Sequence, residues 1–162
     1  MKLLAKLALL GAATALSACN GGAGNMPAGA TIAPSGLQVI PLTITAGSRV
    51  HRFNVEVARS DDEQARGLMF RTELAADAGM IFPFASAKYA SFWMKNTLIP
   101  LDMLFVRADG TIDRIAENTV PESLEPVASG GEVTAVLELA GGTAARLALD
   151  ERARVRWEGG PR

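Results

Sequence analysis

The chain has 162 residues, with 16 Lys or Arg against 17 Asp or Glu and a formal net charge of −1. This balance excludes a strongly basic nucleic-acid-binding protein. The single cysteine excludes an intramolecular disulfide, and the single histidine excludes a zinc site built from several histidines. The sequence has no phosphate-binding loop or dinucleotide fingerprint, so we expect no cofactor. Four methionines, Met69, Met80, Met94 and Met103, lie among apolar residues, which favours core packing over copper binding.

The N-terminus has the pattern of a secretory signal, because Lys2 and Lys6 precede a short apolar stretch that runs from Leu7 to Leu16. A membrane-spanning helix needs roughly 20 apolar residues, so this stretch is too short to remain as an anchor. The sequence Leu16-Ser17-Ala18-Cys19 that follows resembles the lipobox of bacterial lipoproteins. We therefore predict a signal peptide over residues 1–18 and lipidation of Cys19. The alternative is an ordinary signal peptide with a chance cysteine.

A lipidated Cys19 predicts an exported protein that is anchored in the cell envelope and faces the periplasm. Asn20 follows the cysteine, where an Asp would favour the inner membrane, so the outer membrane is the expected location. Residues 19–36 are rich in Gly, Ala and Pro and are predicted to form a flexible tether. The remaining residues, 37–162, have the length of one domain.

The first half of this domain reads as strands interrupted by one helix. Leu37 to Thr45 is β-prone, and Pro41 indicates an edge strand. A second strand is predicted from Arg49 to Ala58. Ser60 and Glu63 then have the spacing of a capping box, which predicts a short helix. Its buried side is expected to contain Ala65, Leu68 and Met69.

The second half reads as short strands with turns between them. The sequence Ala108-Asp109-Gly110 is a strong hairpin signal because glycine tolerates a positive φ. Residues Thr143–Leu149 are predicted to form a helical turn or short helix. The predicted strands are Gly79–Phe84, Ala90–Lys95, Leu101–Arg107, Thr111–Ala116, Glu132–Leu139 and Arg152–Trp157. This pattern predicts a mainly β fold of roughly seven to nine strands, an antiparallel sandwich or barrel with one or two short helices.

Two carboxyl groups interrupt apolar strands. Asp102 shares its predicted face with Leu104 and Val106, and Glu138 shares its face with Val136. An unpaired buried charge is very costly, so each carboxylate is expected either at a solvated strand end or in an ion pair. The candidate partners nearest to Asp102 in sequence are Lys95, Arg66 and Arg71. Ion pairing is the favoured interpretation, and an acid–base role is the alternative.

The segment from Ser91 to Thr97 alternates, so that Trp93 and Lys95 are predicted to face one way and Asn96 the other. An aromatic ring beside a cation and an amide is able to bind a sugar, a peptide or a carboxylate. The favoured interpretation is structural, with Trp93 in the core and the Lys95 side chain extending past it to solvent. Arg66 is able to pair with Asp62 within the helix. Arg71 has no such partner and is expected to reach across the fold.

Four segments together resemble a known family. They are Ala65–Arg71, Gly79–Phe84, Phe92–Asp102 and Val136–Gly142, and in this order and spacing they are similar to the domain of unknown function 192. The resemblance covers roughly residues 50–157. It implies a compact, mainly β, sandwich-like or jelly-roll-like fold that is often exported, and it implies no activity. It also singles out a set of polar residues, some of which we expect to meet in one cluster near Trp93: Arg66, Arg71, Lys95, Asn96, Asp102 and Glu138.

Three functions are compatible with the sequence. The favoured one is a non-catalytic binding module for an envelope ligand, which is a glycan, a peptide or a protein. The second is a structural or assembly factor without a small-molecule site. The third is a hydrolase that uses Asp102 and Glu138 as acid and base, which requires carboxyl groups about 5 to 9.5 Å apart across a cleft. The expected partners are the membrane, through the lipid, and the envelope ligand, with no nucleic acid.

Overall fold

The computed structural model describes residues 31–161, in which eight strands form a single sheet accompanied by two short helices. The lipobox and Cys19 lie outside these residues. No helix in the described part of the chain is long and apolar enough to cross a membrane. The strands are β1 (Thr31–Ile32), β2 (Gln38–Ala46), β3 (Arg49–Val57), β4 (Ala78–Phe92), β5 (Leu101–Val106), β6 (Ile112–Ala116), β7 (Val127–Ala140) and β8 (Arg154–Trp157); the helices are α1 (Asp61–Arg66) and α2 (Thr143–Leu147).

The mainly β prediction is confirmed, but the sheet is mixed. Its order is β1-β2-β3-β4-β7-β5-β6, and β8 pairs with β2. The β3–β4 pair is parallel, from Asn54↔Ala78 to Val57↔Ile81. A parallel pair needs a crossover connection, and here the connection contains α1. The prediction of a purely antiparallel sheet is therefore wrong at this pair.

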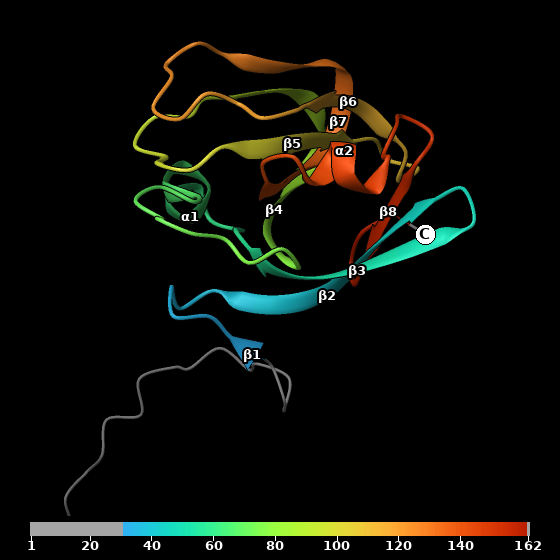
Figure 1. Ribbon diagram of the computed structural model, residues 1–162, viewed down its shortest axis with the longest axis horizontal. Helices are drawn as coiled ribbons and strands as arrows, with labels where there is room; N and C mark the ends of the chain where they lie inside the picture. Colours follow the sequence, from blue (N-terminus) through green and yellow to red (C-terminus); the bar gives the residue numbers. More distant parts are fainter. Residues whose placement is uncertain (1–30, 162) are drawn as a thin grey trace, which may run out of the picture.

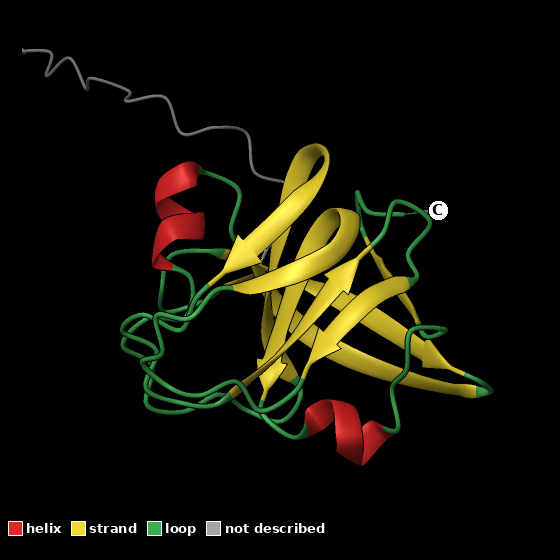
Figure 2. Cartoon of the chain, turned by 90° about the horizontal axis from the view of Figure 1, so that it is seen from above, coloured by secondary structure: helices red, strands yellow, loops and turns green. Residues whose placement is uncertain are grey.

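The sheet curls without closing into a barrel (Figure 1). Its curvature brings β8 to the turn between β5 and β6, where one isolated bridge joins Thr111 to Arg154. All eight strands of residues 31–161 belong to one sheet instead of two stacked sheets. The two helices lie apart from each other beside this sheet (Figure 2). The barrel prediction is therefore wrong, and the coarser prediction of a mainly β fold is what holds.

Side chains from the sheet form two hydrophobic clusters. Alternate residues of a strand point to opposite faces, and β5 is buried on both. Leu104 of β5 and Leu137 of β7 belong to the first cluster, whereas Met103 and Val136 belong to the second. Any polar side chain of β5 or the second half of β7 must therefore enter one of two apolar interiors.

The N-terminal strands correct two predictions. β1 pairs with Gln38 and Val39, so residues 31–36, which were assigned to the tether, belong to the fold. β2 lies inside the sheet instead of at its edge. Pro41 nevertheless sits between the partners of β1 and those of β8, which begin at Leu42. At Pro41 only β3 pairs with β2, and no strand of residues 31–161 pairs with the other side of β2. The missing N–H of proline therefore leaves no backbone acceptor unpaired on that side.

The capping box of α1 is confirmed. The Glu63 N–H donates to Ser60 Oγ at 3.3 Å, and the Ser60 N–H donates to Glu63 Oε2 at 2.8 Å. Hydrogen bonds from the backbone of Ser60 and Arg59 lower the pKa of Glu63. The helix ends at Arg66, so Leu68, which is buried, lies in the following loop, while Ala65 is exposed. The predicted buried side of the helix is therefore wrong.

The two strands predicted between Gly79 and Lys95 are one long strand, β4. Its pairing with β7 shifts register between Pro83 and Lys88 and again between Tyr89 and Ser91. These irregularities bend the strand and re-aim its side chains, as bulges do. The second half of β4 is thereby free to form one wall of a cavity.

Candidate functional site

A cavity of about 580 Å³ lies between α1 with its following loop, β4 and β7. This volume lies in the range of small-molecule binding sites. We call it the Glu138 cavity. Its lining consists of Gln64, Ala65, Arg66, Gly67, Leu68, Met69, Phe82, Phe84, Lys88, Tyr89, Ala90, Ser91, Phe92, Trp93, Thr97, Leu124, Pro126 and Glu138.

The helical wall of the cavity is tied to β4 by Gln64. Its Nε2 donates to the carbonyl oxygens of Ala58, at 3.2 Å, and Pro83, at 3.0 Å. Gly67 follows the helix with a φ of 46°, a conformation that favours glycine. A Cβ there would lie 3.2 Å from Cζ of Phe82, so the glycine also lets the loop approach that ring closely.

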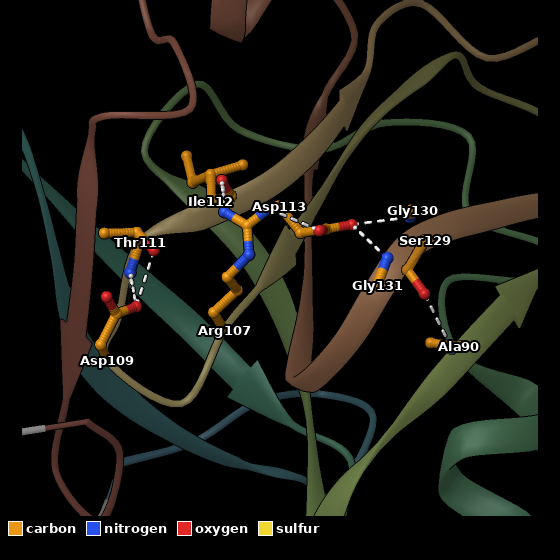
Figure 3. Close-up of polar contacts among 9 residues, drawn as sticks. All are labelled: Ala90, Arg107, Asp109, Thr111, Ile112, Asp113, Ser129, Gly130 and Gly131. Atoms are coloured by element: carbon orange, nitrogen blue, oxygen red, sulfur yellow. Dashed lines mark hydrogen bonds and ion pairs between the residues drawn. The ribbon is translucent and has the colours of Figure 1, made fainter.

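Asp113 of β6 is bonded to the first half of β7, the strand that pairs with the cavity-lining part of β4 (Figure 3). Asp113 Oδ2 accepts the N–H groups of Gly130 at 2.6 Å and Gly131 at 3.1 Å. Its Oδ1 accepts from Nη2 of Arg107 at 2.6 Å. A carboxylate from β6 thus fixes the first half of β7 at its two glycines. Paired glycines inside a strand signal a close backbone approach, and this signal was available in the sequence.

The same segment of β7 holds the cavity wall in β4. The Ala90 N–H donates to Ser129 Oγ at 3.0 Å, at the place where the β4–β7 register shifts (Figure 3). This bond lies within the run from Lys88 to Trp93, which lines the cavity. Asp113 therefore acts on the site indirectly, by positioning the strand that positions the wall.

Glu138 is the acidic residue of the cavity. It lies on β7 opposite Met80 of β4 and Met103 of β5, and it is 5% exposed. Within residues 31–161 its carboxyl group has no ion pair and no hydrogen bond to another side chain or backbone group. Burial raises the pKa of Glu138 to about 8. The group is therefore mostly uncharged at neutral pH and is able both to donate and to accept a hydrogen bond.

Asp102, which is fully buried, has the opposite environment. Its Oδ1 accepts the N–H groups of Asn118 at 2.8 Å and Gly142 at 3.0 Å, and its Oδ2 accepts from Ala144 at 2.7 Å. Two of these donors belong to the start of α2, where backbone N–H groups lack helical partners. The predicted ion pair is therefore wrong for Asp102, because backbone donors take the place of a cation, and it is wrong for Glu138.

The two carboxyl groups lie on opposite faces of the sheet. Asp102 pairs with Leu139, whereas Glu138 pairs with Met103, its neighbour on β5. Asp102 bonds to Ala144 of the first hydrophobic cluster, and Glu138 lies among members of the second. The hydrolase hypothesis, which needs both groups across one cleft, is therefore wrong.

Trp93 follows the end of β4 and is 52% exposed. It lines the Glu138 cavity, and the Lys95 Nζ lies 5.1 Å from the centroid of its ring. The favoured interpretation of Trp93 as a core residue is therefore wrong. Because β4 ends at Phe92, the predicted alternation of side chains from Ser91 to Thr97 does not continue as a strand. Met94 is buried in place of Trp93.

The remaining predicted site residues divide between the cavity and its surroundings. Arg66 lines the cavity. Asn96 joins its loop to the loop after α1, since its carbonyl oxygen accepts from the Phe70 N–H at 2.8 Å. Arg71 reaches across the fold as expected and pairs with Glu56 at 2.7 Å. Of the predicted site residues, Arg66, Trp93 and Glu138 line one cavity, whereas Asp102 and Arg71 are bonded to other groups.

The family model that describes DUF192, "Uncharacterized ACR, COG1430", matches residues 42–157. The chain belongs to the DUF192 family. Two similar crystal structures support the assignment. A protein of unknown function from Novosphingobium aromaticivorans is 46% identical with a TM-score of 0.77, covering 85% of this chain and all of its own. A candidate transcription regulator from Sinorhizobium meliloti is 40% identical with a TM-score of 0.74, covering 76% of this chain and 96% of its own. No curated protein matches.

Several lining residues of this DUF192 domain were missed by the sequence analysis. The clearest are Gln64, Phe84 and Lys88, whose Nζ lies 4.0 Å from the centroid of the Phe84 ring. These residues carry no local pattern that marks them, because the cavity forms only when the bent β4 meets α1. Residues 31–161 contain no group of three or more His, Cys, Asp or Glu side chains placed to hold a metal ion.

Proposed function

We propose that this DUF192 domain is a non-catalytic binding module that takes part of a glycan into the Glu138 cavity. The observation that carries the proposal is the combination of an exposed aromatic residue, Trp93, with an unpaired carboxyl group on the cavity wall. The rings of sugars have apolar faces that pack on aromatic side chains, and their hydroxyl groups need a few well-placed polar partners. Binding sites of this kind are mostly apolar with a small number of polar groups that fix orientation.

The composition of the cavity supports this proposal. Its aromatic residues are Phe82, Phe84, Tyr89, Phe92 and Trp93. Tyr89 is 71% exposed, so it provides a second ring at the surface. The uncharged hydrogen-bonding side chains among its lining residues are Gln64, Ser91 and Thr97, together with the Tyr89 hydroxyl and the Trp93 N–H. A ligand in the cavity is thus offered rings for stacking and a limited set of polar partners.

The place of action is proposed from the sequence. Lipidation of Cys19 and export would anchor the domain in the cell envelope, facing the periplasm, with the outer membrane favoured by Asn20. Envelope glycans would then be within reach of the domain. Labelling with radioactive palmitate tests this part, because Cys19→Ser should abolish the incorporation of lipid.

A protein ligand is the second candidate. Exposed apolar side chains gather on the loops beside the cavity: Phe70 is 61% exposed, Leu98 44%, Val120 69% and Leu124 65%. These loops are bonded to one another, since the Glu122 N–H donates to the Thr97 carbonyl oxygen at 3.0 Å. Exposed apolar patches are common at protein interfaces. The cavity favours the glycan, because a flat protein contact would not need it.

A ligand screen on the whole lipidated chain in detergent tests the proposal. The probes are peptidoglycan fragments, chito-oligosaccharides and unrelated peptides, with thermal shift followed by calorimetry. We expect a saccharide to bind and Trp93→Ala to weaken that binding about tenfold, which corresponds to losing one well-packed aromatic contact. Val50→Ala is the matched control, since Val50 is 49% exposed and lies outside the cavity. Saccharide binding that survives Trp93→Ala, or none at all, would contradict the proposal.

A further inference from the structure

Three cationic side chains lie at or beside the Glu138 cavity. The Lys88 ammonium group rests 4.0 Å from the ring centroid of Phe84, and the Lys95 ammonium group rests 5.1 Å from that of Trp93. Both rings line the cavity, as does Arg66. None of these three cations belongs to an ion pair within residues 31–161, where the paired cations are Arg71, Arg107 and Arg152. The surface around the cavity therefore has unpaired positive charge to offer a ligand.

The wall of the cavity holds a carboxyl group that needs a hydrogen-bond partner. The Glu138 carboxyl group is buried between Met80 and Met103, with no donor or acceptor from the described protein residues. A neutral carboxyl group in such a place has one O–H to donate. An acceptor on the ligand, such as a carbonyl oxygen, would satisfy it. A negatively charged ligand group next to Glu138 would lack a compensating cation, because the residues that pair with Glu138 are methionines.

The surrounding elements carry charges of both signs. Helix α1 contributes Arg66 to the lining, while its acidic residues Asp61, Asp62 and Glu63 lie outside the lining, and β4 contributes Lys88. The residues of β5 and β4 that pair with Glu138 are methionines. The loop before β7 carries the exposed Glu122 and Glu125, but its cavity-lining residues are apolar. Glu138 is therefore the acidic side chain among the cavity's lining residues, and its charge state governs which ligand fits.

We infer that the ligand is an acidic N-acetylated sugar. Its acetamido carbonyl oxygen accepts the hydrogen bond of Glu138, its carboxylate lies near Lys88, and its ring stacks on Trp93. This inference rests on the proposed function, and it names the class of glycan. A cationic ligand is disfavoured because it would have to approach beside Lys88 and Lys95. A neutral sugar would leave the cations without a counter-charge.

Calorimetry with two disaccharides tests the charge preference. The probes are N-acetylglucosaminyl-N-acetylmuramic acid, which has a carboxylate, and N,N′-diacetylchitobiose, which has the same acetamido groups without one. The acidic disaccharide should bind about tenfold more tightly. Lys88→Met should remove this preference, whereas Arg59→Met, at an exposed position outside the cavity, should preserve it. Equal affinities for the two sugars in the unmodified protein would overturn the inference and leave the glycan-binding function standing.

Variants of Glu138 test the hydrogen bond. Affinity for the acidic disaccharide should fall between pH 6 and pH 9, because ionisation of Glu138 removes the donor and places two negative charges in one cavity. Glu138→Gln should bind at both pH values, since an amide still donates, and Glu138→Leu should lose about tenfold. Glu132→Gln, at an exposed position of the same strand, is the control.

Spermidine is the opposing probe. If it binds more tightly as the pH rises and Glu138→Gln abolishes that binding, the cavity is a cation site and the inference is wrong. Failure of every saccharide, with or without an acetamido group, would overturn the proposed function together with the inference. The two failures are distinguishable. Binding of spermidine would leave a ligand in the Glu138 cavity, whereas failure of every saccharide would leave none.

Discussion

Asp102 and Glu138 are two buried carboxyl groups on adjacent strands, and the protein treats them in opposite ways. Asp102 accepts three backbone N–H groups and links β5 to α2 and to the loop at Asn118. Glu138 points to the other face of the sheet, where it has no partner among the described residues and borders a cavity. Both side chains are inaccessible or nearly so, with exposures of 0% and 5%.

The difference separates structure from function. A fully bonded buried carboxylate stabilises the elements that it joins, so its presence is explained by the fold alone. An unpaired buried carboxyl group costs stability, and such groups tend to be retained where a ligand uses them. This difference favours Glu138 over Asp102 as the carboxyl group that serves the proposed binding function.

The largest effect is expected from Asp102→Ala. The substitution leaves three buried N–H groups without acceptors, so the free energy of unfolding should fall by roughly 5 kcal/mol. Denaturation in urea measures this loss. Asp77→Ala is the control, since Asp77 is exposed, and it should change stability by less than about 0.5 kcal/mol. A small loss at Asp102 would mean that its hydrogen bonds are not needed to hold α2 in place.

Glu138→Gln should stabilise the protein in a pH-dependent way. The folded pKa of about 8 lies above the ordinary 4.5, so ionisation opposes folding. The stability that comes from burying the uncharged Glu138 is fully present below pH 4.5 and is lost as the pH rises toward 8. At pH 7 the cost is about 3 kcal/mol, which the glutamine removes.

Stability curves of the Glu138→Gln variant should therefore meet those of the unmodified protein near pH 4 and diverge above it. Glu132→Gln, whose side chain is exposed, should give parallel curves. A variant that is less stable than the unmodified protein at pH 8 would show that Glu138 has a stabilising partner, which would break the comparison with Asp102.

Asp113→Ala should cost about 2 kcal/mol, because two backbone N–H groups of β7 lose their acceptor. Hydrogen exchange of the amides from Lys88 to Phe92 should also quicken, since that wall of the cavity is held through β7. Arg107→Met, which removes the 44%-exposed partner of the ion pair, should cost less than about 1 kcal/mol. Unchanged exchange in β4 would remove Asp113 from the account of the site.

The smallest effect is expected at the Arg71–Glu56 pair. Its side chains are 28% and 10% exposed, and Glu56 keeps the hydrogen bond from Ser35 Oγ when Arg71 is replaced, so Arg71→Met should lower stability by about 1 kcal/mol. Arg66→Met, in the same region but without an ion pair among the described residues, should leave stability unchanged. Chemical denaturation of both variants measures the difference. Equal losses would show that Arg71 contributes through its aliphatic portion alone.

Local signals in the sequence predicted much of the fold. The spacing of Ser60 and Glu63 predicted the capping box, and Gly110, with a φ of 84°, occurs at the predicted hairpin. The parallel pairing of β3 with β4 and the continuity of β4 were missed, because both depend on contacts between distant segments. Alternation within one segment gives the faces of a strand and not its neighbours.

The candidate site was predictable only where a local sequence signal marks its residues. Charges within apolar strands identified Asp102 and Glu138 as unusual, and the segment around Trp93 was singled out as a binding candidate. Their partners were wrong, because the sequence does not reveal that the backbone at the start of α2 meets Asp102. Lys88 and Phe84 were missed since the bend of β4 that places them is set by its register with β7.

The most direct test of the account is a ¹³C NMR titration of the Glu138 carboxyl carbon, assigned by its absence in Glu138→Gln. A midpoint near pH 8 is expected, since the group is buried beside the cavity without a partner among the described residues. Addition of the acidic disaccharide should move the midpoint further upward, because its carbonyl oxygen accepts from the protonated form. A midpoint near the ordinary value of 4.5 would contradict the claim that Glu138 is an uncharged hydrogen-bond donor in the folded protein.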